Sequence, residues 1–163
     1  MKLTLSAKPF AALLKAVLPA VATRPGLPIL SGVRLEASEG GLIIEATDLE
    51  LTVRRVLRDG VEVHAARSVV VPAKALAKAV LAMPDSKIEL ASVPTDGRAD
   101  LDVRAGTPTV TLQAWATEDW PSVSAAEAID PIGSIDASAA ADAFETVPGW
   151  WPRLLRNRAT GTS

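Results

Sequence analysis

The stretch TRPGLPILSGVRLEA, residues 23–37, decides the fold because the chain changes there from helical to strand-like periodicity. Before it, residues 7–22 read AKPFAALLKAVLPAVA and have the spacing of an amphipathic helix. Pro25-Gly26 and Pro28 exclude a helix or a central strand and predict a turn over residues 23–28. Residues 29–37 then form a strand-like run. The chain is therefore predicted to be an α+β protein.

The predicted first helix has one apolar face, formed by Phe10, Leu13, Leu14, Val17 and Val21. Pro9 fits the first helical turn, where a missing N–H costs little. Pro19 is expected to bend or end the helix. Lys8 and Lys15 are two turns apart and share a different face.

A second helix is predicted over residues 72–83, between Pro72 in its first turn and Pro84 after its end. Its inward positions are Leu76, Ala79, Val80 and Met83. Lys74 and Lys78 are one turn apart on an exposed face.

Short strand-like segments make up most of the remaining chain, at residues 1–6, 42–48, 49–57, 68–71, 87–91, 99–104 and 109–114. Turn residues such as Asp59-Gly60 and Asp96-Gly97 separate them, which favours antiparallel meanders over parallel βαβ units. Residues 117–123 are a polar connector. A further short helix is expected within residues 137–147.

Composition excludes several classes of function. The chain has 163 residues and no cysteine, so disulfides, thiolate metal sites and cysteine nucleophiles are absent, as in many cytosolic proteins. His64 is the only histidine, which excludes a Ser-His-Asp triad and a two-histidine metal site. No apolar run is long enough for a membrane span, and the start does not resemble a signal peptide. We expect a cytoplasmic protein with no catalytic, metal or cofactor site.

Charge is segregated along the chain, although the net charge is only −2. Residues 1–35 and 63–84 contain lysine and arginine but no carboxylate, whereas residues 113–152 contain seven carboxylates and no lysine or arginine. The two basic segments include both predicted helices. They predict one positive face on an acidic molecule. The alternative is that ordinary solvated helix faces happen to carry lysine.

Six segments together resemble the first domain of bacterial sliding clamps, the beta subunit of DNA polymerase III. They are MKLTLSAKPFAALLKAV, TRPGLPILSGVRLEA, ATDLELTV, VVVPAKALAKAV, LDVRAG and EDWPSV, in this order. The resemblance covers residues 1–123. Residues 124–147 resemble the start of a second clamp domain, with the match at 132–147, and residues 148–163 form a tail that resembles nothing in the family.

This resemblance implies a DNA-clamp domain with two helices on one side of curved antiparallel sheets. In the family, three such domains form a subunit, and two subunits close a ring around duplex DNA. The ring performs no catalysis; it is a processivity factor of the DNA-directed DNA polymerase III holoenzyme in chromosomal replication. Polymerase subunits and the clamp loader bind a cleft in later domains, which this chain lacks, and without the third domain it cannot close the family's homodimeric ring alone.

The resemblance also implies site residues. Arg24, Lys74 and Lys78 are expected to contact double-stranded DNA, together with Lys8 and Lys15. Val110, on an edge strand, and Lys74 are expected at the subunit interface. Thr107-Pro108-Thr109 replaces a more basic stretch of the family, and Pro108 is expected at a sheet edge or at the start of a strand. In each case the alternative is a surface residue without a partner.

Two other functions remain open. The chain could be a clamp fragment that acts as a protein–protein module and binds the subunit interface of a full clamp. It could also be a metal-dependent nuclease that uses Asp48, Glu50, Asp100 and Asp102. For the nuclease, Asp48 and Glu50 are expected on one face of a strand.

Overall fold

We analysed a computed structural model, which describes residues 1–84, 87–95, 98–121, 136 and 138–139. The chain divides into two compact units, Met1–Val123 and Ser124–Ser163. The helices and strands named below all belong to the first unit. The second-domain start expected at residues 124–147, with its strand and helix, and the tail at 148–163 lie almost entirely outside the described residues.

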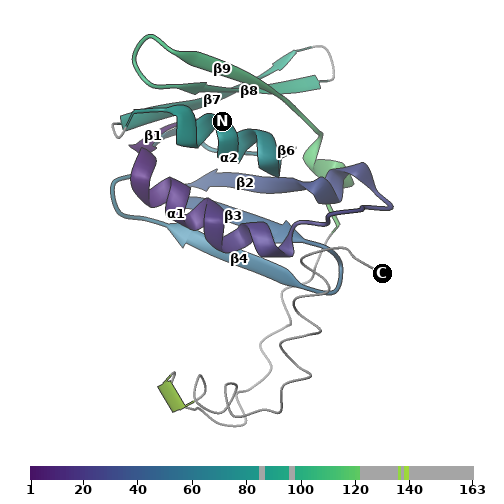
Figure 1. The fold of residues 1–163 in the computed structure, drawn as a ribbon. Helices are drawn as coiled ribbons and strands as arrows, with labels where there is room; N and C mark the ends of the chain where they lie inside the picture. The colour runs from purple at the N-terminus through teal and green to yellow at the C-terminus, as the bar shows by residue number, and fades with distance from the viewer. Residues whose placement is uncertain (85–86, 96–97, 122–135, 137, 140–163) are drawn as a thin grey trace. The chain divides into compact units, whose positions relative to one another are not determined.

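Nine strands form two antiparallel sheets in the described part of the chain (Figure 1). The five-stranded sheet A has the order β5-β1-β7-β8-β9, and the four-stranded sheet B has the order β4-β3-β2-β6. Their bounds are β1 Lys2–Ser6, β2 Gly32–Ser38, β3 Gly41–Thr47, β4 Thr52–Leu57, β5 Glu62–Ala65, β6 Arg67–Pro72, β7 Lys87–Thr95, β8 Arg98–Arg104 and β9 Thr109–Ala114. Within the described residues, one isolated bridge joins the two sheets, between Val70 of β6 and Trp115 directly after β9.

Both helices lie on the same side of the sheets, one beside the other (Figure 1). The first, α1, spans Ala7–Val17, and the second, α2, spans Ala73–Ala82. Pro19 ends α1 as predicted, because the next residues form a short 3₁₀ turn, η1, at Leu18–Ala20. Two further 3₁₀ turns are η2, Pro28–Ser31, and η3, Thr117–Asp119.

One apolar, mostly aliphatic core joins both sheets and both helices. From α1 it takes Phe10, Leu14 and Val17, and from α2 it takes Leu76 and Val80, all almost fully buried. The sheets contribute alternate residues of their strands, including Leu3, Leu5, Leu35, Ile44, Leu90 and Leu101. This confirms the predicted inward faces of the helices and the fold class of two helices on one side of antiparallel sheets.

A second, smaller cluster fixes the segment that leaves the domain. Trp120 is buried against Ile29, Leu30 and Val70. Its indole N–H donates a hydrogen bond to Glu45 Oε1 at 2.8 Å. Glu45 is itself buried on β3, and its second neighbour is the guanidinium of Arg34 at 3.8 Å. A buried carboxylate needs such partners, so Trp120 both fills space and satisfies Glu45.

The structure differs from the sequence prediction at four places. Strand β5 was not predicted, because only its second residue is part-buried and its alternation is weak. Residues 28–31 form η2 and not the start of a strand. Strand β4 begins at Thr52, after a turn, and not at residue 49. Strand β7 continues past residue 91 to pair with β8 as far as Thr95.

Removing only the hydrogen bond of Trp120 tests the role of this side chain. We expect Trp120→Phe to lower the free energy of unfolding by about 1–3 kcal/mol, because a buried carboxylate loses its donor. Urea unfolding followed by circular dichroism measures this change. Trp115→Phe is the matched control, since Trp115 is only half-buried; equal losses in the two variants would contradict the assignment.

Candidate nucleic-acid interface

The lysines of the two helices point away from the core because the apolar faces point into it. Lys8 and Lys15 on α1 are exposed, while Phe10 and Leu14 between them are buried. On α2, Lys74 and Lys78 are exposed and occupy successive turns of the helix. The helical period therefore separates the charged from the apolar positions in both elements.

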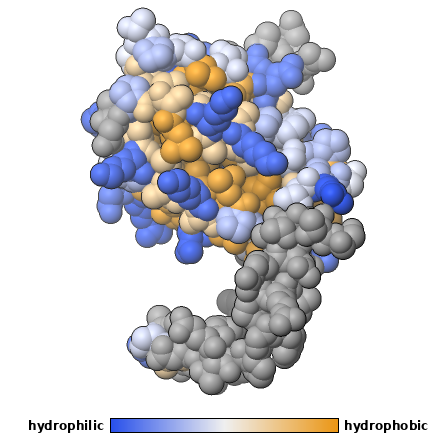
Figure 2. Space-filling view, viewed as in Figure 1, coloured by the Kyte–Doolittle hydropathy of each residue, from blue (hydrophilic) through white to orange (hydrophobic). Residues whose placement is uncertain are grey.

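A shallow groove of about 410 Å³ runs between the helices. It is lined by Ala7, Lys8, Ala11, Ala12, Lys15, Val80, Leu81 and Met83. Figure 2 shows this face of the molecule, with hydrophilic side chains around a band of hydrophobic surface. The structure thus brings Lys8 and Lys15 together at one groove, whereas Lys74 and Lys78 lie on α2 outside it.

None of these four lysines forms an ion pair within the described residues, and neither does Arg24. Three cations of sheet A behave differently. Lys2 lies 3.8 Å from Glu89, Lys87 lies 3.1 Å from Glu62, and Arg104 lies 2.6 Å from Asp102. The helix face therefore keeps uncompensated positive charge, whereas these cations on the sheets are neutralised by neighbours.

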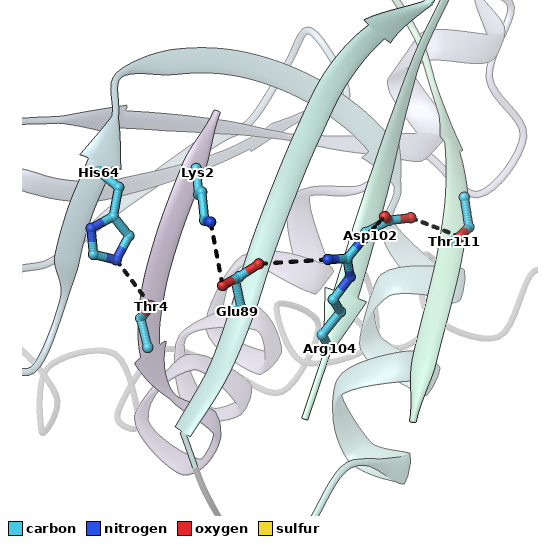
Figure 3. Close-up of polar contacts among 7 residues, drawn as sticks. All are labelled: Lys2, Thr4, His64, Glu89, Asp102, Arg104 and Thr111. Carbon is cyan, nitrogen blue, oxygen red and sulfur yellow. Dashed lines mark hydrogen bonds and ion pairs between the residues drawn. The ribbon is translucent and has the colours of Figure 1, made fainter. Parts of the chain in front are cut away.

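The outer face of sheet A is crossed by a row of polar contacts from β5 to β9 (Figure 3). His64 contacts Thr4 at 3.2 Å, and the Lys2–Glu89 pair continues through Arg104, 3.9 Å from the other Glu89 oxygen. Asp102 then accepts a hydrogen bond of 2.7 Å from Thr111 on β9. This row pairs Lys2, Glu89, Arg104 and Asp102 with one another on the outer face of the sheet.

The hydrogen bond from Thr111 holds the pKa of Asp102 below its ordinary value, and Arg104 adds to the same effect. A carboxyl group that accepts hydrogen bonds in its charged form resists protonation. Asp102 is therefore a partnered structural carboxylate.

The protein-family comparison decides which known proteins share this arrangement. Residues 1–124 match the family model described as "DNA polymerase III beta subunit, N-terminal domain". The chain belongs to this family.

Solved sliding clamps share the fold of this clamp-family domain. The clamp of Caulobacter crescentus is 27% identical with a TM-score of 0.70, over 78% of this chain and 34% of that one. The clamp of Bartonella birtlesii is 30% identical with a TM-score of 0.65, over 74% of this chain and 31% of that one. For Bacillus subtilis the values are 21%, 0.69, 74% and 33%. The chain thus spans about a third of the length of the clamps it matches.

Arg24, the other residue expected to contact DNA in this clamp domain, is exposed in the loop between η1 and η2. It does not line the groove between the helices. Pro25 restricts the backbone of this loop, and Pro28 begins η2 at the loop's end. The structure therefore separates Arg24 from the groove that holds Lys8 and Lys15.

The expected interface residue Val110 lies half-buried on β9, the edge strand of sheet A. Pro108 directly precedes this strand, as predicted for an edge position, and its carbonyl accepts a hydrogen bond from Ala105 N–H at 3.1 Å. Lys74 is exposed on α2, which packs next to β9. Sequence analysis missed Leu81, which is 61% exposed and lines the groove. The one feature of the sequence that indicated its exposure was its position outside the apolar stripe of the helix.

The four carboxylates considered for a nuclease do not gather. Asp48 and Glu50 lie in the turn between β3 and β4 of sheet B, while Asp100 and Asp102 lie on β8 of sheet A. In the described ranges, no three His, Asp or Glu side chains approach closely enough to hold a metal ion. The same part of the chain has no helix long and apolar enough to cross a membrane.

The expectation that Asp48 and Glu50 share a strand face is wrong, because these residues form a turn. Asp48 Oδ1 accepts hydrogen bonds from Glu50 N–H at 3.0 Å and Leu51 N–H at 2.7 Å. Leu49 has a φ of 78°, in the left-handed region, and Thr47 Oγ1 accepts a bond from its N–H. Asp48 therefore shapes the turn, as side chains of this type commonly do.

The bond between Thr111 and Asp102 makes a testable contribution to stability. We expect Thr111→Val to raise the pKa of Asp102 toward its ordinary value, measured by a carboxyl-carbon NMR titration. A depressed pKa stabilises the folded state above the unfolded-state pKa, and this is lost as pH falls through the folded-state value. The variant should therefore be less stable at neutral pH, by less than about 1 kcal/mol for an exposed pair, and the difference should vanish in acid. Thr109→Val on the same strand is the control and should leave the Asp102 titration unchanged.

Proposed function

We propose that this chain contacts duplex DNA without sequence specificity, as a sliding-clamp processivity factor in chromosomal DNA replication. The positive helix face makes the contact, through Lys8, Lys15, Lys74 and Lys78, with Arg24 in the adjoining loop. The observation that carries the proposal is the absence of ion pairs for these five cations in the described part of the chain, on helices that lie side by side.

Unpaired lysines suit a contact that holds DNA but lets it move. A lysine ammonium is a compact, strongly hydrated charge on a flexible stem, whereas arginine forms a rigid fork that fixes one geometry. Contacts of this kind go to phosphates and carry no sequence information. Their strength falls as salt rises, because bound counterions are released.

The remaining roles of the family are proposed for this chain only as far as its length permits. The chain spans about a third of the clamps that it matches. We propose that it contributes a DNA-facing domain and performs no catalysis, while nucleotidyl transfer belongs to the polymerase. Association with DNA polymerase III subunits and the clamp loader, ring closure as a homodimer, and a cytoplasmic location are inferred from the family.

A second candidate function is supported by the free edge of β9. In the described residues β9 pairs along its length only with β8, and Val110 lies on this strand. The chain would then bind the subunit interface of a full-length clamp. We expect a mixture of the two proteins to elute earlier than either alone in size-exclusion chromatography, and Val110→Asp to abolish the shift. Unchanged elution at tens of micromolar would rule this function out.

The DNA contact is tested by reversing charge on the helix face. We expect Arg24→Glu, Lys74→Glu and Lys78→Glu together to weaken binding to a fluorescent duplex, measured by anisotropy at low salt. The slope of log affinity against log salt should fall by about 0.9 for each phosphate that the variant no longer neutralises. Two duplexes of unrelated sequence should bind equally well to the unmodified chain.

The matched control reverses three cations elsewhere: Lys2→Glu, Arg58→Glu and Lys87→Glu. It changes net charge by the same amount and should largely retain binding, because Lys2 and Lys87 already face carboxylates. Circular dichroism checks that both triple variants fold. Equal weakening in the two variants, or a helix-face variant that binds like the parent, would show that the helices are not the DNA contact.

A further inference from the structure

The groove between α1 and α2 combines an apolar wall with a charged rim. The wall is formed by Val80 and Leu81 of α2 and by Met83 directly after it, while Lys8 and Lys15 line the α1 side. Leu81 is 61% exposed and is the one helical residue among the large hydrophobic side chains exposed in the described part of the chain. An exposed apolar surface with a polar rim marks a site of interaction.

A contact with DNA leaves this apolar wall without a role. Contacts that ignore base sequence go to phosphate and sugar oxygens, which attract charge and hydrogen-bond donors and gain nothing from a leucine side chain. Burial of Leu81 against an apolar partner would be favourable, because it removes the side chain from water. The wall therefore indicates a second occupant of the groove, whose surface is apolar as well as charged.

The charge of the groove calls for an acidic occupant. Among the described residues that line it, Lys8 and Lys15 are charged and none is acidic. Neither lysine forms an ion pair within the described ranges. Carboxylates of a partner would meet uncompensated positive charge, and this attraction would also speed the encounter.

The spacing along α1 suits a helical occupant. Lys8 and Lys15 are two helical turns apart, about 10 Å along the axis. Between them Ala11 and Ala12 line the groove with methyl groups only, so a second helix can approach α1 closely there. A helix with carboxylates at the same spacing places one opposite each lysine, and apolar side chains between them meet Leu81. This is the helix-in-groove mode of recognition.

We propose that the groove binds an acidic amphipathic helix of a partner protein, and that the bound helix displaces DNA from Lys8 and Lys15. The partner directs its glutamate or aspartate side chains at α1 and its apolar side chains at α2. Binding of the helix needs only the groove, whereas the displacement rests on the proposed function. Such a partner would loosen the hold of the domain on DNA without any catalysis.

The shape of the site favours a helix over a membrane surface, which also combines negative charge with an apolar interior. A lipid bilayer presents a broad and nearly flat surface. The apolar residues here line a groove of about 410 Å³ between two helices. A rod-like helix fills such a groove, and anionic vesicles become the competing ligand in the test.

The experiment uses the full chain and a fluorescent helical peptide in which two glutamates, two turns apart, flank a pair of leucines on the same face. Anisotropy without DNA measures peptide binding. We expect Leu81→Gln to weaken it about tenfold or more, and to leave binding of a duplex unchanged. Lys8→Glu with Lys15→Glu should abolish peptide binding and also weaken duplex binding. Unlabelled peptide should weaken duplex binding by the parent chain.

Matched controls separate the groove from general charge and hydrophobicity. Leu27→Gln changes a leucine that is 53% exposed in the loop before η2, and should bind the peptide like the parent. Lys2→Glu with Lys87→Glu changes net charge as much as the groove pair does, and should also bind it. The neutral pair Lys8→Gln with Lys15→Gln covers a failure of the reversed variant to fold, and should weaken peptide binding. A peptide of shuffled sequence should bind at least about tenfold more weakly.

The outcomes distinguish this inference from the proposed function. A chain that binds duplex but not peptide would overturn this inference alone, and a chain that binds peptide but not duplex would overturn the DNA contact and the displacement. Peptide binding unaffected by Leu81→Gln, or weakened equally in the controls, would show that the groove is not the site. A duplex that stays bound at saturating peptide would overturn the displacement. Capture of the chain by phosphatidylglycerol vesicles, with no peptide binding, would assign the groove to a membrane instead.

Discussion

Phe10 and Leu14 from one helix, and Leu76 and Val80 from the other, are buried in a core that both sheets share. The direction of the charged helix faces follows from this shared burial. The core is apolar, so it places no directional demand on its neighbours, but it requires both helices to turn their apolar faces toward the sheets. Their charged positions are then necessarily directed away from the sheets.

The ion pairs distinguish the outer face of sheet A from the helix face. On the outer face of sheet A, Lys2 and Arg104 share Glu89, and Asp102 bridges Arg104 and Thr111. On the helix face the described lysines lack carboxylate neighbours, because the helices and the residues around them contain none. One domain thereby carries a face with paired charges and a face with unpaired positive charge, which is the division that the proposed DNA contact requires.

Helices and most strands were predictable because burial sets their periodicity. The stripe of α1, the limits set by Pro19 and Pro84, and the lysine positions follow from the spacing of apolar residues. Strand β5 was not predictable, because three of its four residues are exposed and it is held by pairing with β1. The turn at Leu49 was missed for a related reason: its apolar side chain continues a strand-like alternation, while hydrogen bonds to Thr47 and Asp48 impose a bend.

The candidate site was predictable to a similar degree. Exposure of the lysines follows from helix periodicity alone. Their grouping does not, because only the packing of the helices places Lys8 and Lys15 at one groove and leaves Lys74 and Lys78 outside it. A cavity beside Trp115 could not be predicted from any local pattern, because its lining comes from four separate segments of the chain. These are Pro72, Asp100, residues 113–116 and Asp119.

The attachment of Trp120 has a mechanical consequence. Where the chain leaves the domain, Trp115 is tied by its backbone to Val70 and Trp120 is tied by its side chain to Glu45 in the interior of sheet B. A pull on the chain beyond Pro121 would therefore load β6 and the interior strand β3 of sheet B as well as the edge strand β9. The load would then be shared with the hydrogen bonds that β3 makes on both of its sides, instead of falling on the outermost strand alone.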